Sequence, residues 1–140
     1  MNFTVVSVGR LKEAYWVAAV NEYVKRIGVF GKIRLVDVKD DESLPAAIPQ
    51  GWLVFALCIE GERLSSEGFS ERLERAYLSG KKGICFVIGG AEGLPRQIKE
   101  ECDCALSLSD MTFPHRLAKI MLLEQLYRAL SIQNNRKYHR

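Results

Sequence analysis

The sequence predicts an α/β fold in which a mostly parallel sheet is flanked by helices. Short β-branched or apolar runs alternate with helical patterns along the chain, and this order is typical of parallel sheets. Two of the apolar runs are continuous, as in strands covered on both faces. The 140 residues, 48% hydrophobic and 26% charged, suit one globular domain spanning residues 1–140 and exclude a disordered chain.

In the first half of the chain, the spacing of apolar residues predicts the elements. Alternation and β-branched residues indicate strands, whereas apolar residues that fall on one helical face indicate helices. Gly28 and Gly31 end the first helix, and the segment before the third strand is rich in proline. The expected elements are a strand at Phe3–Val8, a helix at Ala14–Ile27, a half-exposed strand at Lys32–Val38, a loop at Lys39–Gly51 and a buried strand at Trp52–Ile59.

The second half continues the alternation of strands and helices. Ser65 or Ser66 is expected to cap a second helix that Gly80 ends. Pro95 opens a short third helix, because proline is favoured in the first helical turn. The remaining expected elements are a buried strand at Gly83–Ile88, a strand at Cys104–Leu108 and a long helix from Pro114 to about Ile132.

The net charge is concentrated in the last residues. The chain has 20 basic and 17 acidic side chains, a formal net charge of +3. Arg136, Lys137 and Arg140 are the basic residues of segment 134–140, which has no acid, so residues 1–133 carry 17 of each sign and are neutral. A neutral body excludes a generally basic nucleic-acid coat, but it allows a local contact between the tail and an anion.

No segment has the features of a targeting or membrane-spanning sequence. The apolar stretch at Phe3–Val8 is too short for a signal sequence and follows no basic residue. The longest uncharged run, Ser43–Ile59, is interrupted by Pro45, Pro49 and Gln50. We therefore expect a cytoplasmic protein.

The four cysteines are then expected to be thiols. Cys58 and Cys85 lie inside apolar runs, which predicts core positions. Cys102 and Cys104 are two residues apart, and no second Cys or His pair stands at zinc-ligand spacing. We expect no bound metal.

A glycine turn, Gly89-Gly90-x-x-Gly93, follows the predicted strand at Gly83–Ile88. α/β proteins bind ligands beyond the carboxyl ends of their strands, and paired glycines let a backbone approach a ligand closely. A tight turn between strand and helix explains the pattern equally well. The order differs from the dinucleotide fingerprint, and no Gly-Lys-Ser/Thr follows as in a P-loop.

A second crossing from strand to helix lies at Leu106–His115. Its hydroxyls, backbone amides and apolar side chains suit a flat, adenine-like ligand. The alternative is a plain helix start, with Thr112 as the cap and Pro114 in the first turn. His115 is more simply explained as a hydrogen-bonding residue of that helix start than as a catalyst.

The long last helix is apolar on nearly all sides, which predicts that it is buried. An edge helix of a small domain can be buried on all sides only by a partner, so we expect a homodimer. Deep burial within one chain is the alternative. The apolar residues concerned are Leu117, Ile120, Met121, Leu122, Leu123, Leu126, Tyr127 and Leu130.

The tail, Asn134–Arg140, adds Tyr138 and His139 to its cations. Such a set can pair with phosphates and stack on a base. A solvated tail without a ligand is the alternative.

Together these segments resemble the ribosomal RNA large subunit methyltransferase H family, which belongs to the SPOUT methyltransferases. The resemblance extends over nearly the whole chain, and it includes the opening VSVGRLKEAYW. It implies an α/β fold with a C-terminal trefoil knot, and a homodimer that binds S-adenosylmethionine. It also implies methylation of N3 of a pseudouridine in helix 69 of 23S rRNA, within the assembled ribosome. The segments that carry the resemblance are FVIGGAEGL (Phe86–Leu94), LSLSDMTFPH (Leu106–His115), EQLYRALSI (Glu124–Ile132) and YHR (138–140).

The resemblance also implies the site residues. Leu57 and Gly89 match cofactor contacts of the family by position, and Tyr138, His139 and Arg140 match a C-terminal motif associated with substrate binding and catalysis, so that 133–140 is a functional tail. His139 either accepts the proton of N3 or only contacts RNA, and Arg140 is suited to stabilise charge on the base carbonyls. The family's adenosine-wrapping loop is matched by Leu108, Ser109, Asp110, Met111, Thr112 and Phe113.

The sequence departs from the family pattern in two places. The segment between Val38 and Trp52 is shorter than usual, so we expect its connecting helix to be missing. Cys58 and Glu62 stand where the family more often has an acid and a lysine, which weakens one RNA or cofactor contact.

Two other functions fit the same fold. A non-enzymatic module that binds the ribosome or RNA would bind RNA regardless of cofactor. A SPOUT methyltransferase acting on tRNA would leave ribosomal RNA unmodified.

Overall fold

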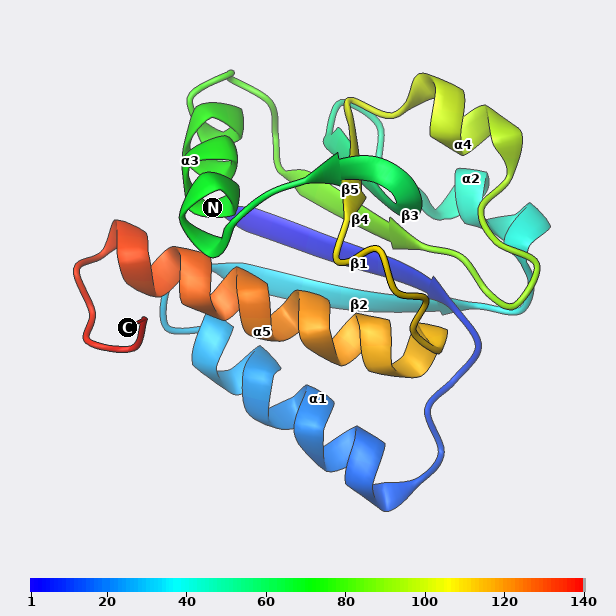
Figure 1. Cartoon of the computed structure of the whole chain (residues 1–140), viewed down its shortest axis with the longest axis horizontal. Helices are drawn as coiled ribbons and strands as arrows, with labels where there is room; N and C mark the ends of the chain where they lie inside the picture. Colours follow the sequence, from blue (N-terminus) through cyan, green and yellow to red (C-terminus); the bar gives the residue numbers. More distant parts are fainter. Residues whose placement is uncertain (140) are drawn as a thin grey trace.

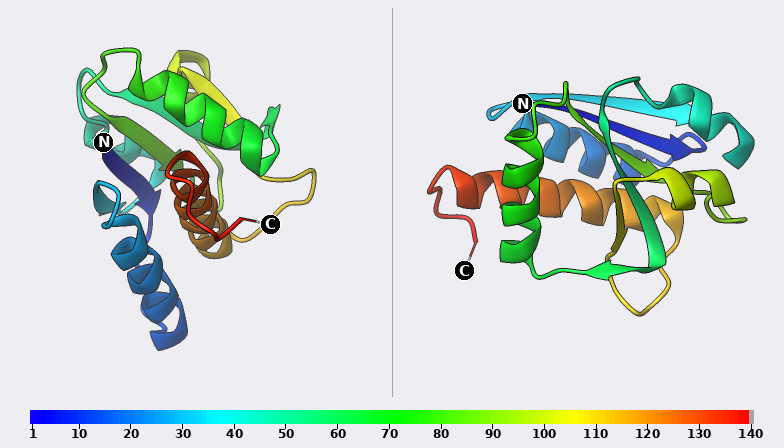
Figure 2. Two further views of the ribbon diagram at one scale, coloured as in Figure 1. Left: turned by 90° about the vertical axis from the view of Figure 1, so that its left-hand side faces the viewer. Right: turned by 90° about the horizontal axis from the view of Figure 1, so that it is seen from above.

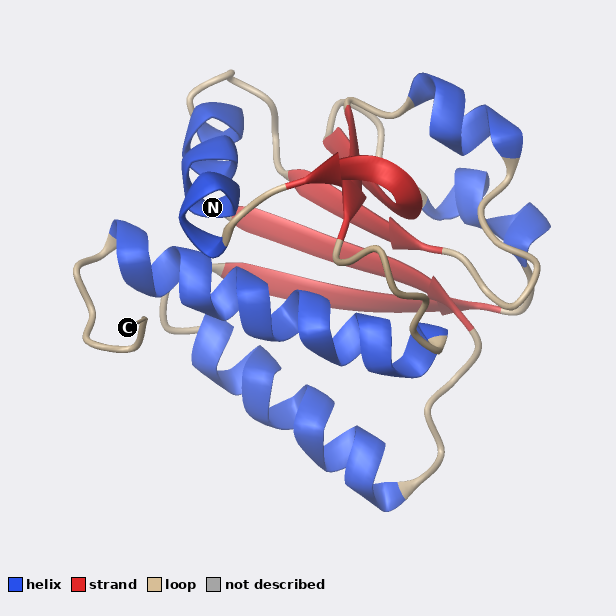
Figure 3. Cartoon of the chain, viewed as in Figure 1, coloured by secondary structure: helices blue, strands red, loops and turns tan. Residues whose placement is uncertain are grey.

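A computed structural model describes residues 1–139 and shows an all-parallel sheet of five strands in the order β2-β1-β4-β3-β5 (Figure 1). This confirms the predicted α/β class, and Figure 3 shows helices around the sheet. The elements are β1 (Asn2–Val8), α1 (Ala14–Ile27), β2 (Lys32–Val38), η1 (Asp41–Ser43), α2 (Leu44–Ala47), β3 (Leu53–Arg63), α3 (Ser66–Tyr77), β4 (Ile84–Ile88), α4 (Arg96–Glu101), β5 (Cys104–Ser107) and α5 (His115–Gln133).

Helices cover both faces of the sheet, which explains the continuous apolar runs of its central strands. α1, α3 and α5 pack on one face, and α2 and α4 pack on the other (Figure 2). Neighbouring residues of a strand point to opposite faces, so Val5 and Phe86 join the first core, while Val6 and Val87 join the second. The side chains of all four residues are fully buried.

β3 is longer than the predicted strand because its polar end crosses over β5. The strand pairs with β5 up to Leu57 and again from Glu62, with an irregular register between them. At the crossing, a Cβ on Gly61 would lie 2.7 Å from the carbonyl carbon of Ala105, so only glycine allows the two backbones to come this close. The apolar run ends before this segment, and periodicity therefore gives no sign of it.

The segment between β2 and β3 is not the plain loop that the sequence predicts. It contains the short helices η1 and α2, and the Asp40 carboxylate caps the first by accepting from the Ser43 backbone N–H at 2.9 Å. Pro45 lies at the start of α2, where its missing N–H costs nothing. Leu44 is fully buried and helps to cover the second face of the sheet.

α5 lies between α1 and α3, and this central position buries most of its apolar surface within one chain (Figure 1). Leu122, Leu123 and Leu126 are 0% exposed. The alternative of burial within the monomer therefore accounts for these residues, and the assignment of Leu123 to a dimer interface is wrong. Leu117 and Met121 remain half-exposed on α5, and so does Ile132 at the far end of the helix, beyond the ion pair of Glu124 and Arg128.

α5 also carries a buried cation. Lys119, with a side chain only 5% exposed, donates from Nζ to Oδ1 of Asp37 on β2 at 3.0 Å. The Ser7 hydroxyl donates to the same oxygen at 3.4 Å. This cluster ties α5 to the carboxyl ends of β1 and β2.

We expect Asp37→Ala to destabilise the fold more than Lys119→Met does. Removing the carboxylate leaves a buried ammonium without a counter-charge, which costs about 3 kcal/mol. Removing the ammonium leaves a carboxylate whose side chain is 37% exposed and can be hydrated. Urea denaturation of both variants measures the two free energies of unfolding, and equal losses would contradict this asymmetry.

Candidate functional site

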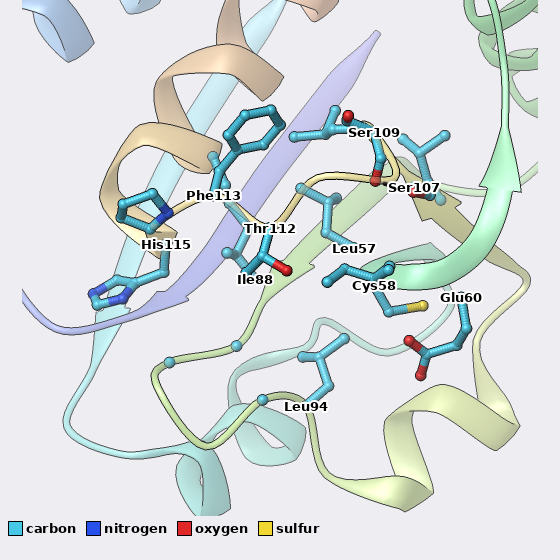
Figure 4. Close-up of a pocket in the computed structure, with 18 of the residues that line it drawn as sticks. Leu57, Cys58, Glu60, Ile88, Leu94, Ser107, Ser109, Thr112, Phe113 and His115 are labelled. Atoms are coloured by element: carbon cyan, nitrogen blue, oxygen red, sulfur yellow. Dashed lines mark hydrogen bonds between the residues drawn. The ribbon is translucent and has the colours of Figure 1, made fainter.

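A cavity of about 740 Å³ opens at the carboxyl ends of β4 and β5 and beside the middle of β3, where that strand stops pairing with β4 (Figure 4). Leu57, Ile88 and Leu106 from these three strands form its apolar floor. The glycine turn 89–93 forms one wall, and the loop 108–114 with the first turn of α5 forms the opposite wall. This is where parallel α/β sheets hold ligands.

The glycine turn is shaped by contacts within itself. A Cβ on Gly89 would lie 2.8 Å from both the Gly93 carbonyl carbon and the Leu94 nitrogen. Gly93 has a φ of 82°, which strongly favours glycine. The Gly90 N–H donates to Oδ1 of Asp41 at 2.8 Å, so the short helix η1 anchors the turn. The residues of the turn both close a tight bend and line the cavity.

The loop after β5 places its residues in two environments. Leu108, Ser109, Met111, Thr112 and Phe113 line the cavity, together with Leu57 and Gly89. Asp110 is not among the lining residues, and its carboxylate pairs with Arg63 at the end of β3. The Ser109 hydroxyl accepts from the Met111 N–H at 3.0 Å and stabilises the bend of the loop.

The start of α5 differs from the predicted helix cap. Pro114 is the N-cap residue and no side chain caps the helix, so the alternative in which Thr112 caps it is wrong. Thr112 lines the cavity instead, and His115 lies at the same wall (Figure 4).

An ion pair at the cavity rim was not visible in the sequence. Lys99 on α4 donates to Oε1 of Glu60 at 2.7 Å, across 39 residues of chain. This hydrogen bond raises the pKa of Lys99 and lowers the pKa of Glu60, so both groups are charged near neutral pH. No local spacing connects two such residues, and only the folded chain brings them together.

The cysteines divide by environment. Cys85 is fully buried, as predicted, and burial raises its pKa to about 12, so its thiol is unreactive at neutral pH. Cys58 is half-buried: it packs against the second core, as predicted, but it also lines the cavity. Within residues 1–139, no group of three or more His, Cys, Asp or Glu side chains is placed to hold a metal ion. In the same residues, no helix has the length and hydropathy to cross a membrane.

The C-terminal residues pack on α5, α3 and α1, where burial and the adjoining Tyr138 raise the pKa of Tyr23. The Tyr138 ring packs edge-on against the Tyr127 ring, with 4.7 Å between the two ring centroids. The Arg128 guanidinium lies 4.8 Å from the centroid of the Tyr138 ring. His139 contacts Glu67 through Nε2 at 2.5 Å and Arg128 through Nδ1 at 3.1 Å. A carboxylate only accepts and a guanidinium only donates, so this geometry fits a neutral ring protonated at Nε2.

Within one chain, the tail and the cavity are far apart. The cavity includes the first turn of α5, whereas the tail follows its last residue. The tail turns back onto Tyr127 and Arg128, which lie nine and ten positions beyond Ala118, the last cavity residue on α5, so about 14 Å of helix separates the nearer of them from the cavity. Tyr138 and His139 therefore do not reach the cavity of their own chain, and Arg140 lies outside the described residues.

A family model and two named relatives all identify methyltransferases as the proteins to which this chain is similar. A family model described as predicted SPOUT methyltransferase matches residues 1–139. The chain is 36% identical to ribosomal RNA large subunit methyltransferase H of Acetivibrio thermocellus and 39% identical to the protein of that name from Ruminiclostridium cellulolyticum. Both alignments cover 100% of this chain and 100% of the relative.

A solved structure supports the fold. It is that of a probable methylase family protein from Haemophilus influenzae, which is 14% identical and superposes with a TM-score of 0.56. The match covers 99% of this chain and 70% of the other.

Proposed function

The chain belongs to the ribosomal RNA large subunit methyltransferase H family of SPOUT methyltransferases, and from this premise we propose that it methylates N3 of a pseudouridine in helix 69 of 23S rRNA in the assembled ribosome. The observation that carries the proposal is the similarity to the named relatives over the full length of both chains. Ribosomes are cytoplasmic in bacteria, so a cytoplasmic location follows from this substrate. The trefoil knot that the family implies stays a prediction.

S-adenosylmethionine is the methyl donor in this proposal, and the cavity fits it. Its volume of about 740 Å³ is within the range of roughly 300–1,000 Å³ for small-molecule sites. The loop 108–113 would hold the adenosine over the apolar floor, and the Gly89 backbone would approach the cofactor beside Leu57. The cofactor supplies a methyl group activated on a sulfonium, so the protein must mainly hold donor and acceptor in line.

The tail would supply the groups that act on the base. N3 of pseudouridine must lose its proton, and a neutral His139 ring has a lone pair on Nδ1 that can accept one. Arg128 occupies that lone pair in the packed position, so the contact must open before His139 acts. Tyr138 offers a face for stacking, and Arg140 would stabilise negative charge on the base carbonyls.

A homodimer would bring a tail and a cavity together, because Tyr138 and His139 do not line the cavity of their own chain and pack on residues of α5 about 14 Å from it. Apolar side chains are exposed near the cavity, where the second chain of the proposed dimer would pack. At the cavity rim, Ile59 is 49% exposed and Met111 is 72% exposed. Leu117 and Met121, one turn apart near the start of α5, continue this surface. We propose that the partner's tail completes each site.

Met121→Glu is expected to convert the dimer to a folded monomer, because the charge would enter the proposed interface on α5. Sedimentation at micromolar concentration measures the change, and circular dichroism checks the fold. Met121→Leu is the matched control and should remain dimeric. Leu123→Glu should instead unfold the chain, since Leu123 is a core residue. A monomeric wild-type protein would contradict the dimer.

Mass spectrometry of RNA from a strain that lacks the protein tests the proposed reaction. We expect loss of one methyl group from a helix 69 pseudouridine, and purified protein should restore it with S-adenosylmethionine. Loss of a methyl group from tRNA alone would indicate the tRNA enzyme. Unchanged RNA together with ribosome binding that ignores cofactor would indicate the non-enzymatic module.

A further inference from the structure

The neutral body of the protein has an uneven distribution of charge. Lys32 begins β2, Lys81 and Lys82 precede β4, and Arg75 lies in the last turn of α3. These four cations are exposed at the end of the sheet opposite the cavity. We call them, with Tyr77 between them, the amino-end surface.

Contacts join the amino-end surface to the tail. The Lys32 N–H donates to the Met1 carbonyl at 3.0 Å, and Met1 lines a cleft of about 180 Å³ together with Tyr77, Lys81 and Lys82. On the other side of Lys32, the Arg136 guanidinium lies 5.8 Å from the centroid of the Phe30 ring. The segment from Phe30 to Lys32 therefore lies between the tail and the cleft that Lys81 and Lys82 line.

The cations of this surface are free to bind an anion. In the part of the chain that the structure describes, Lys32, Arg75, Lys81 and Lys82 make no ion pair, whereas Arg72, Lys99 and Arg128 are all paired. Glu71 and Glu74 share α3 with Arg75, and Arg72 together with Arg75 lowers the pKa of Glu62 on β3, so the excess of positive charge lies with Lys32, Lys81 and Lys82. The Tyr77 side chain, 56% exposed, adds an aromatic face among the cations. Unpaired cations interleaved with an exposed aromatic suit a nucleic-acid backbone.

We propose that the amino-end surface binds phosphates of the ribosomal RNA that flanks the target base. This inference rests on the proposed function and on the placement of the tail in the partner's site. The end of the molecule that delivers the tail then also brings Lys32, Lys81 and Lys82 to the RNA beside that site. Contacts to phosphates position the substrate without reading its sequence.

The test compares two double variants with equal changes in net charge. Lys81→Glu/Lys82→Glu alters the amino-end surface, and Lys12→Glu/Lys39→Glu alters exposed lysines of the loops at the cavity end of the sheet. We expect the first variant to weaken ribosome binding and raise KM at least tenfold, with kcat and S-adenosylmethionine binding unchanged. Its plot of log affinity against log salt should lose about two units of slope. The Lys12/Lys39 variant should resemble the wild type.

Lys81→Arg/Lys82→Arg separates loss of charge from loss of fold, because it keeps both cations and should keep wild-type affinity. Equal affinities of the Lys81/Lys82 and Lys12/Lys39 variants for ribosomes would overturn the proposal. So would loss of binding to vesicles of acidic lipid with ribosome binding unchanged. Ribosome binding is measured without methyl transfer, so wild-type protein that binds ribosomes but does not methylate them would contradict the proposed function and not this surface.

Discussion

Deletion of Tyr138–Arg140 is expected to lower methyl transfer to ribosomes at least about a hundredfold, the smallest effect typical of losing an acid–base group. Fold and cofactor binding should not change. Tyr138 and His139 contact the surface of α5, α3 and α1, through Tyr127, Arg128, Glu67 and Tyr23, and neither belongs to a core cluster.

Single substitutions should separate the roles of His139 and Arg140 in the tail. His139→Gln keeps hydrogen-bonding groups but removes the basic ring, so kcat should fall at saturating ribosomes. Arg140→Ala should chiefly raise KM for ribosomes. The assay is transfer of labelled methyl groups to pseudouridylated ribosomes that lack the modification, and full activity of the truncated protein would move catalysis away from the tail.

Gly89→Val is expected to abolish binding of S-adenosylmethionine. The valine Cβ would overlap the backbone of Gly93 and Leu94 at 2.8 Å, so the wall of the cavity must move. The cause is therefore distortion of the glycine turn, not the filling of ligand space that the sequence alone suggested. Calorimetry measures cofactor binding, and circular dichroism measures the fold.

Gly93→Ala is the matched control for this turn. A Cβ at Gly93 meets no atom within 4 Å, so the substitution carries only the cost of a positive φ, about 1–2 kcal/mol. It should weaken cofactor binding moderately without abolishing it. Wild-type affinity in a folded Gly89→Val protein would remove the turn from the site.

The order of elements and the place of the cavity could be predicted from the sequence, because both depend on local patterns. The apolar run at Gly83–Ile88, followed by paired glycines, identifies a buried strand and the turn at its carboxyl end. The serine cap was also predictable, and Ser65 caps α3 by accepting from the Gly68 N–H at 3.0 Å.

Other features depend on residues that only the fold brings together. The Glu60–Lys99 pair and the crossing of Gly61 over β5 join distant segments, and neither leaves a periodic signal. The apolar pattern of α5 shows that the helix is buried, but it does not distinguish a partner from the flanking helices α1 and α3. For the same reason, the net charge located the excess cations in the tail and missed the amino-end surface within the neutral body.

A mixing experiment tests whether one chain's cavity and the partner's tail form the methylating site. The tail-deleted protein and Gly89→Val are each expected to be inactive dimers. In a mixed dimer, the intact cavity of the first chain meets the intact tail of the second, so re-association should restore about a quarter of the wild-type sites. Labelled methyl transfer to ribosomes that returns on mixing is the predicted result, and a mixture of confirmed heterodimers that stays inactive would contradict a site shared between two chains.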